Sequence, residues 1–288
     1  ADESGIWPGS AHPHSYVPAD GSSKSTDTAD DRARITTMLA VSVSGRLMPQ
    51  FLILKCSSKS ADLSRTTVLN TVFEKLESDH TDRWEKLSWT RTITYKSREG
   101  LMISVKFTRP YLRDRVSRSV VTIQHRAWMD RVGLYMFGDL VAGPYVASLA
   151  VKNGVIIMDN CSCHCSEDVQ TFFASLKITL AFLPPRMTDI LQIVDLVICG
   201  PLKAYMRRER LLPIYHSFQK YHDDLVRRST DNLPPVPWVQ PTIELHEAVC
   251  NLVDFNANKN DDPVFAETIT KCFQKASQWY KDSTSMQF

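Results

Sequence analysis

The chain has 288 residues, of which 43% are hydrophobic and 23% are charged, and this composition excludes an intrinsically disordered protein. The formal net charge of +2 is too small to argue for nucleic acid by itself, so any such argument depends on local basic clusters. No run of about 18 apolar residues is present, which excludes a transmembrane helix.

The N-terminal residues and the cysteine content indicate the cellular compartment of the protein. Residues 1–5 have neither a basic nor an apolar segment, so they do not form a signal peptide. The chain starts with Ala1 rather than Met, and we expect a fragment or an excised domain. Its seven Cys form no even framework, which indicates a reducing compartment, the cytosol or the nucleus.

The first predicted element is a β-hairpin. A polar tract at residues 19–31, dominated by Gly, Ser, Thr and Asp, has the composition of a loop. Residues 34–43 are rich in β-branched side chains, Ser44-Gly45 is a turn signal, and residues 47–55 form a second apolar segment. This order predicts two antiparallel strands joined by a turn.

The next part of the chain mixes weaker signals. Apolar spacing at residues 67–76 predicts a helix, and residues 84–95 are compatible with a short strand. Residues 99–131 are mainly notable for their basic side chains. A helix is predicted from about 126 to 141 and is expected to break at Gly143-Pro144.

A strand–helix–strand unit follows. Residues 154–159 predict a short buried strand, residues 166–176 an amphipathic helix with Ser166 at its N-cap, and residues 178–183 a second strand. Such a unit is expected to make a right-handed parallel crossover.

The last third is expected to be helical. A long helix is predicted at about 196–228, with Gly200-Pro201 kinking it or delaying its start. A proline-containing linker at 234–237 precedes two closing helices at 242–255 and 263–281.

The central motif is residues 155–164, which read Val-Ile-Ile-Met-Asp-Asn-Cys-Ser-Cys-His. Asp159 ends a buried strand, where a carboxylate is costly unless a cation pairs with it. Ligand sites in open α/β sheets gather at the carboxyl ends of strands. The alternative is that Asp159 only caps the next helix or starts a turn.

The thiols after this strand resemble a zinc cluster only superficially. Cys161, Cys163, His164 and Cys165 occupy alternate or adjacent positions of one short loop. Structural zinc sites usually have paired ligands with two to four residues between them. Free thiols in a turn are therefore the favoured interpretation.

Three carboxylates stand at the ends of segments that we expect to be buried: Asp2, Asp159 and Asp195. The predicted crossover brings Asp159 and Asp195 to the same edge of the sheet. Carboxylates brought together repel unless a cation sits between them. Mg²⁺ suits such a site, and two such ions about 3.5–4 Å apart promote cleavage of a phosphodiester.

Each of these residues has a simpler interpretation. Asp2 is also compatible with a solvated terminal residue, and Asp195 with a helix N-cap. His164 is also compatible with a polar residue that is satisfied within a turn.

Taken in order, these segments resemble the DDE superfamily endonuclease domain of pogo/mariner-type DNA transposases and their domesticated relatives. Asp2-Glu3-Ser4-Gly5 resembles the family's Asp-Glu-Thr-Gly motif, and residues 156–164 resemble its strand-Asp-Asn-x-x-x-His motif. Residues 183–185 and 191–195 resemble Leu-Pro-Pro followed by Leu-Gln-Pro-Leu-Asp. Residues 200–203 continue in register with pogo-like members.

The resemblance implies an α/β, RNase H-like fold, with a mixed five-stranded sheet flanked by helices on both faces. It implies that Asp2, Asp159 and Asp195 are catalytic residues that hold two Mg²⁺ or Mn²⁺ ions. It also implies that Asn160 and His164 orient a ligand or the substrate. The expected reaction is DNA cleavage by water and strand transfer by a 3′-hydroxyl.

Two departures from the family pattern leave alternatives open. Ile193-Val194 replaces the usual Pro-Leu, and Arg186-Met187 replaces a more usual Asn-x, both ahead of the third acid. A misplacement of about 1 Å there would cost about 10²-fold in rate. The alternatives are a domesticated, catalytically impaired DNA-binding or chromatin protein, and an RNase H-like nuclease acting on RNA–DNA hybrids.

We expect DNA as the partner, no membrane, a nuclear location, and we allow for a homodimer. Basic residues that would contact DNA phosphates are Lys106, Arg109, Arg113, Arg115, Arg118, Lys203, Arg207, Arg208 and Arg210. The alternative for the second cluster is an ordinary solvated helix face. We expect a catalytic domain at 1–230 and a linker with a helical extension at 231–288, with the family's upstream helix-turn-helix region absent from this chain.

Overall fold

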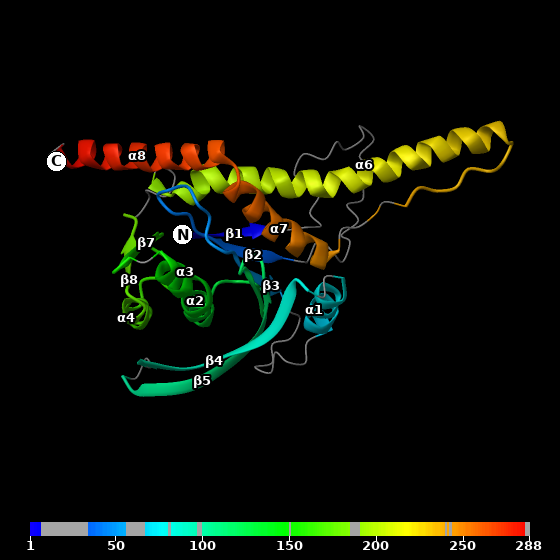
Figure 1. Cartoon of the computed structure of the whole chain (residues 1–288). Coiled ribbons are helices and arrows are strands. Elements are labelled where there is room, and N and C mark those ends of the chain that lie inside the picture. The colour runs from blue at the N-terminus through cyan, green and yellow to red at the C-terminus, as the bar shows by residue number, and fades with distance from the viewer. Residues whose placement is uncertain are drawn as a thin grey trace.

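Two β-sheets form the centre of the fold in the computed structural model (Figure 1). The structure describes residues 1–6, 34–55, 67–79, 82–96, 100–149, 151–184, 191–239, 241 and 244–285. The strands are β1 (Asp2–Ile6), β2 (Ile35–Leu39), β3 (Phe51–Lys55), β4 (Trp84–Lys96), β5 (Met102–Asp114), β6 (Val120–Gln124), β7 (Gly154–Met158) and β8 (Ile178–Phe182).

The larger sheet is mixed and has six strands in the order β1-β2-β3-β6-β5-β4, while β7 and β8 form a separate parallel pair. The prediction of a single five-stranded sheet is therefore wrong. The reason is that β6 and the long β4–β5 hairpin extend the sheet beyond β3. One backbone hydrogen bond of 2.5 Å, from Ala1 N to Ile157 O, connects the start of β1 to β7. Counting that bond, β8, β7, β1, β2 and β3 are consecutive, which is consistent with an RNase H-like arrangement.

Helices cover both faces of the strands, as expected, and Figure 1 shows α6, α7 and α8 on one side and α2, α3 and α4 on the other. The helical segments are α1 (Thr67–Asp79), α2 (Arg131–Phe137), η3 (Gly138–Ala142), α3 (Gly143–Ser148), α4 (Glu167–Ser175), η4 (Val194–Cys199), α6 (Gly200–Thr230), α7 (Leu245–Asn260) and α8 (Pro263–Ser285). η3 and η4 are π-helical. None of the helices in the described part of the chain is long and apolar enough to cross a membrane.

Strand β3 explains why two hydrophobic clusters exist. Its residues Phe51 to Leu54 are completely buried, and side chains of a strand alternate between faces. Phe51 and Ile53 pack into the cluster beneath α2, α3 and α4, whereas Leu52 and Leu54 pack into the cluster beneath α7 and η4. A strand buried on both faces is continuously apolar, as this segment is.

The predicted hairpin, the helix near 67–76, the crossover at 154–183 and the two closing helices are all confirmed. The predicted helix near 126 begins only at Arg131, after the N-cap Asp130. The predicted break at Gly143-Pro144 is wrong, because helical structure continues through η3 into α3. Pro144 stands in the first turn of α3, where its missing N–H is not needed.

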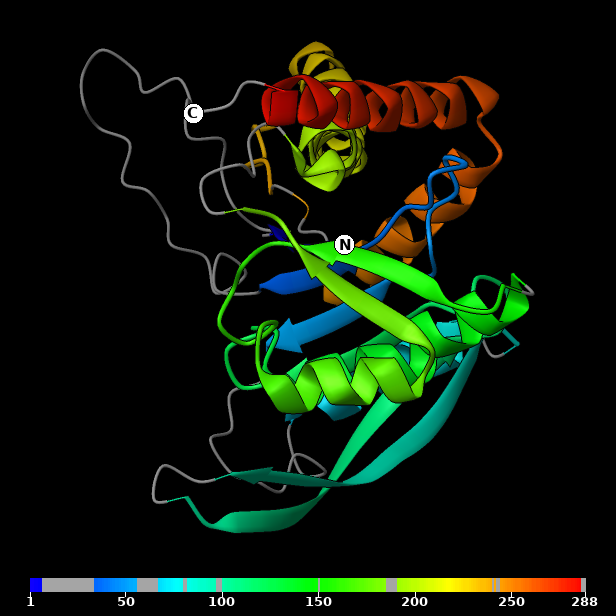
Figure 2. The same ribbon diagram turned by 90° about the vertical axis from the view of Figure 1, so that its left-hand side faces the viewer.

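Residues 84–131 contain more β-strand than the sequence pattern predicts. The segment near 84–95 is a 13-residue strand, and it pairs with a second 13-residue strand inside the basic stretch. Figure 2 shows this hairpin curving away from the rest of the sheet. Arg186 and Met187 lie outside the described residues.

Gly138 is a position where the fold requires a glycine. A Cβ there would lie 2.4 Å from Cε1 and 2.8 Å from Cζ of Phe172, which comes from α4. We expect Gly138→Ala to destabilise the protein by about 1–3 kcal/mol through overpacking. Gly200→Ala is the matched control, because its Cβ would meet nothing within 4 Å. Equal urea midpoints for the two variants would contradict this packing.

Candidate active site

Strand β1 directs Asp2 towards η4. Asp2, Ser4 and Ile6 are buried and alternate with the half-buried Glu3 and Gly5. Ile6 packs in the same cluster as Ile198 of η4, so the buried face of β1 is the one that η4 covers. Pairing with β2 fixes the register, with Asp2 opposite Leu39. Asp2 is therefore held on a rigid strand.

The π-helical segment η4 supplies the second acid. Asp195 lies in its first turn and Cys199 is its last residue. The carboxylates of Asp2 and Asp195 and the sulfur of Cys199 offer ligand atoms that lie within 4.8 Å of one another. The structure thus brings together two of the three predicted acids, and π-helical turns are frequent at functional sites.

The surroundings of Asp2 and Cys199 raise the pKa of both side chains. Burial, followed by the charges of Asp195 and Glu3 and a hydrogen bond to Asp195, raises the pKa of Asp2 to about 7. Burial also raises the pKa of the Cys199 thiol to about 11, partly offset by a hydrogen bond to Ser4. Without a cation, the two carboxyl groups therefore retain a proton between them near neutral pH.

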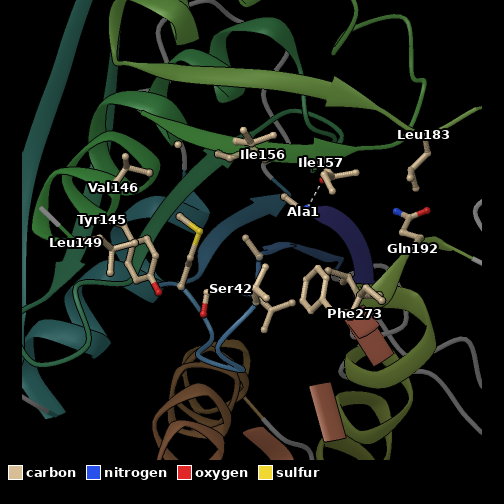
Figure 3. Close-up of a pocket in the computed structure, with 18 of the residues that line it drawn as sticks. Ala1, Ser42, Tyr145, Val146, Leu149, Ile156, Ile157, Leu183, Gln192 and Phe273 are labelled. Carbon is tan, nitrogen blue, oxygen red and sulfur yellow. Dashed lines mark hydrogen bonds between the residues drawn. The ribbon is translucent and has the colours of Figure 1, made fainter. Parts of the chain in front are cut away.

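The ligand atoms of Asp159 are not part of the group within 4.8 Å. Asp159 follows β7, which the bond between Ala1 N and Ile157 O connects to β1 (dashed in Figure 3). The Oδ1 atom of Asp159 is 2.6 Å from Nδ1 of His164. The Nε2 atom of His164 is 2.9 Å from Oε1 of Glu3. His164 therefore connects the end of β7 to the residue after Asp2.

His164 is completely buried between these two carboxylates. Burial alone would lower the pKa of His164, but hydrogen bonds to Cys163 and Glu3 outweigh it and raise that pKa to about 11. The raised pKa favours the imidazolium form, which can donate to both carboxylates. The contact with Asp159 gives His164 the role of positioning the Asp159 carboxylate.

We expect His164→Gln to lower the free energy of unfolding by about 1–3 kcal/mol, because it leaves Glu3 and Asp159 without their shared cation. His222→Gln is the matched control, since the His222 side chain is 65% exposed and lies 3.8 Å from Asp223. That control should stay within about 0.5 kcal/mol of the parent. Urea unfolding measures both, and an equal loss would contradict the role assigned to His164.

The turn between β7 and α4 holds the remaining predicted residues. The Oδ1 atom of Asn160 accepts a hydrogen bond from Cys165 Sγ at 2.8 Å, within the turn. The sulfurs of Cys161 and Cys163 are 3.3 Å apart, and both lie within 4.8 Å of a His164 nitrogen. Both nitrogens of His164 already face carboxylates, so this group offers a metal ion fewer ready ligands than its composition indicates.

A mostly apolar cavity of about 250 Å³ is lined in part by Ala1 and Val194, the chain neighbours of Asp2 and Asp195 (Figure 3). Ala1 and Ile157 form one wall, and Gln192 and Phe273 lie across from them. An apolar lining does not suit a phosphate group, so we expect the substrate backbone to approach the acids from outside this cavity.

The predicted DNA contacts fall into two groups on different sides of the molecule (Figure 1). Arg109 is 9% exposed and its guanidinium lies 2.6 Å from the Asp130 carboxylate, so it has a structural role. Arg113 is half-buried over the ring of Tyr111. The residues that remain exposed are Lys106, Arg115, Arg118, Lys203, Arg207 and Arg208, while Arg210 is half-buried.

The α6 group is nearer to the acids along the chain. Lys203 follows Asp195 by eight residues, which corresponds to roughly 12 Å along a helix. Arg208 stacks on Tyr205 at 5.1 Å and lies 2.8 Å from Glu209. The exposed start of α6 is therefore the better-placed basic surface.

The paired carboxylates fit a divalent cation, because carboxylate oxygens are the ligands that Mg²⁺ and Mn²⁺ prefer. A comparison with family models matches residues 32–243 to the DDE superfamily endonuclease. The match includes Asp159 and Asp195, and Asp2 precedes it. A comparison with curated proteins finds no match. The family match covers most of the chain, and with the acidic pair at the meeting of β1 and η4 it shows that the chain belongs to the DDE superfamily endonucleases.

Proposed function

We propose that this chain is the catalytic domain of a pogo/mariner-like DNA transposase, which cleaves DNA and transfers the strand with two divalent cations. The observation that carries the proposal is the meeting of Asp2 and Asp195 within 4.8 Å, from segments almost two hundred residues apart. Family membership supports an endonuclease. The catalytic domain would span residues 1–230, with 231–288 as its extension, and would act in the nucleus.

In this mechanism the chain's own residues hold and orient the reactants. Asp2 and Asp195 would hold the cation, and Asp159 would add a ligand from the end of β7. The bound Mg²⁺ or Mn²⁺ supplies Lewis-acid chemistry that activates a water or 3′-hydroxyl and stabilises the leaving oxygen. His164 keeps the Asp159 carboxylate oriented, as outer-shell partners of metal ligands do.

The DNA backbone would approach along the exposed start of α6. Lys203, Arg207 and Arg208 offer positive charge to phosphates there, without reading sequence. Binding should therefore weaken steeply with salt. The proposal includes no base-specific contact.

One observation favours a second candidate, a catalytically impaired DNA-binding protein on the same fold. The Asp159 carboxylate faces His164 and stays outside the group formed by Asp2 and Asp195. If that arrangement persists with a cation bound, the ligand set is incomplete. Such a protein would bind DNA but would not cleave it.

A nicking assay tests the proposal. Purified protein is incubated with supercoiled plasmid in Mg²⁺, in Mn²⁺ or with a chelator. We expect conversion to open circles with either cation and none with the chelator. Salt-sensitive DNA binding without nicking would favour the second candidate, and cleavage confined to RNA–DNA hybrids would contradict the DNA substrate.

A further inference from the structure

Cys199 is a thiol inside the proposed cation site. It is 5% exposed, and its sulfur lies within 4.8 Å of the ligand oxygens of Asp2 and Asp195. It packs in the same hydrophobic cluster as Ile198 and Leu202, and its sulfur also approaches the two carboxylates. The thiol therefore faces the acids and is not simply a small apolar side chain of the core.

The backbone holds these three ligands in place. Asp195 and Cys199 are four residues apart on η4, so their side chains lie on one side of that helical turn. Asp2 comes from β1, whose register is fixed by five residue pairs with β2. Sites built on helices and strands are more precisely positioned than sites on loops.

The ligand set has a chemical preference. Two carboxylates and one thiolate match the mixed oxygen and sulfur ligands of Zn²⁺, whereas Mg²⁺ takes oxygen ligands. Bond lengths of about 2.0–2.3 Å place tetrahedral ligands roughly 3.5 Å apart. A separation within 4.8 Å therefore needs only a small side-chain adjustment to close around one ion.

We propose that Cys199 is a further ligand beside Asp2 and Asp195, and that this site binds thiophilic divalent cations such as Zn²⁺ and Cd²⁺ more tightly than Mg²⁺ or Mn²⁺. The proposal rests on the proposed function, because it assumes that the acid pair holds a cation. It has a consequence for that function: Zn²⁺ would occupy the site and inhibit nicking supported by Mg²⁺.

The test uses Cd²⁺, whose bond to a thiolate gives an ultraviolet charge-transfer band. Cys161 and Cys163 are changed to Ser in every sample, because they form the second thiol cluster beside His164. Cd²⁺ is titrated into this parent and into the same protein with Cys199→Ser, which keeps a side chain of similar size. Mn²⁺ binding is measured on both by electron paramagnetic resonance.

We expect the parent to show the thiolate band and Cys199→Ser to lose it, with Cd²⁺ affinity falling more than about 100-fold, since even outer-shell changes cost 10–100-fold. Mn²⁺ affinity should change less than tenfold. If Cys199→Ser fails to fold, Cys199→Ala and Asp195→Asn replace it, and each should lose the band.

An unchanged Cd²⁺ band and affinity in the Cys199 variants would overturn the proposal. If Mn²⁺ still binds in that case, the acid pair and the proposed function stand without Cys199. If the parent binds neither Mn²⁺ nor Cd²⁺, the cation site itself fails and both proposals are overturned.

Discussion

Asp2→Asn and Asp195→Asn are each expected to remove nicking of supercoiled DNA in Mg²⁺ or Mn²⁺, with a loss of more than about 10²-fold. The amide keeps the shape of the side chain but takes away the charge that holds the cation. Because the two carboxylates share one site, the double variant should lose no more activity than either single variant. Plasmid nicking at a fixed protein concentration measures the loss.

Asp223→Asn is the matched control for this experiment. The same chemical change is made here in the last third of α6, where the Asp223 side chain is 84% exposed. This variant should nick DNA as well as the parent. Asp159→Asn tests whether the third acid completes the ligand set, since a working triad loses activity with it. If Asp2→Asn, Asp195→Asn and Asp159→Asn all still nick DNA, these acids have no catalytic role.

The second large effect is a dependence of stability on pH and on a divalent cation. Burial and the neighbouring Asp195 raise the pKa of Asp2 from 3.8 to about 7. A raised pKa contributes stability below the unfolded value, and that contribution is lost as pH rises through the folded value. The free energy of unfolding should therefore fall between about pH 4 and pH 7, by on the order of a few kcal/mol.

A cation should reverse this loss. At pH 8 both carboxylates are charged, and Mg²⁺ or Mn²⁺ relieves their repulsion, so the unfolding midpoint should rise with cation concentration. At pH 4 the cation should have little effect. Asp2→Asn should flatten the pH dependence and abolish the response to the cation, while Asp223→Asn should change neither. Urea unfolding across this pH range, with and without Mn²⁺, measures these effects, and a rise in stability from pH 4 to pH 7 would contradict the raised pKa.

Local patterns made much of the fold predictable. The strand at 154–158 and the helix after it carry strong signals within a few residues, and β7, α4 and β8 lie where expected. The β4–β5 hairpin was missed although Thr90, Thr92 and Thr94 alternate with larger side chains. The basic residues of β5 looked like a surface patch, yet Arg109 pairs with Asp130, beyond the hairpin.

The candidate site was only partly predictable, because local sequence patterns do not show which distant residues meet. The motif order pointed to Asp2 and Asp195, and the structure brings them together. Cys199 was missed, although it follows Asp195 by four residues at the start of a predicted helix. The partnership of His164 with Glu3 spans most of the chain, so no local pattern contains it. The π-helical turns were also missed, because η3 and η4 span only five and six residues, which is too short for a distinct spacing to show.

The central claim, that Asp2 and Asp195 together hold a divalent cation, is tested most directly by titrating Mn²⁺ and following its free signal by electron paramagnetic resonance. The unaltered protein and Asp223→Asn should both bind Mn²⁺ at pH 8, and Asp195→Asn should bind it at least about 10-fold more weakly. Equal Mn²⁺ binding by Asp195→Asn and the unaltered protein would contradict the claim.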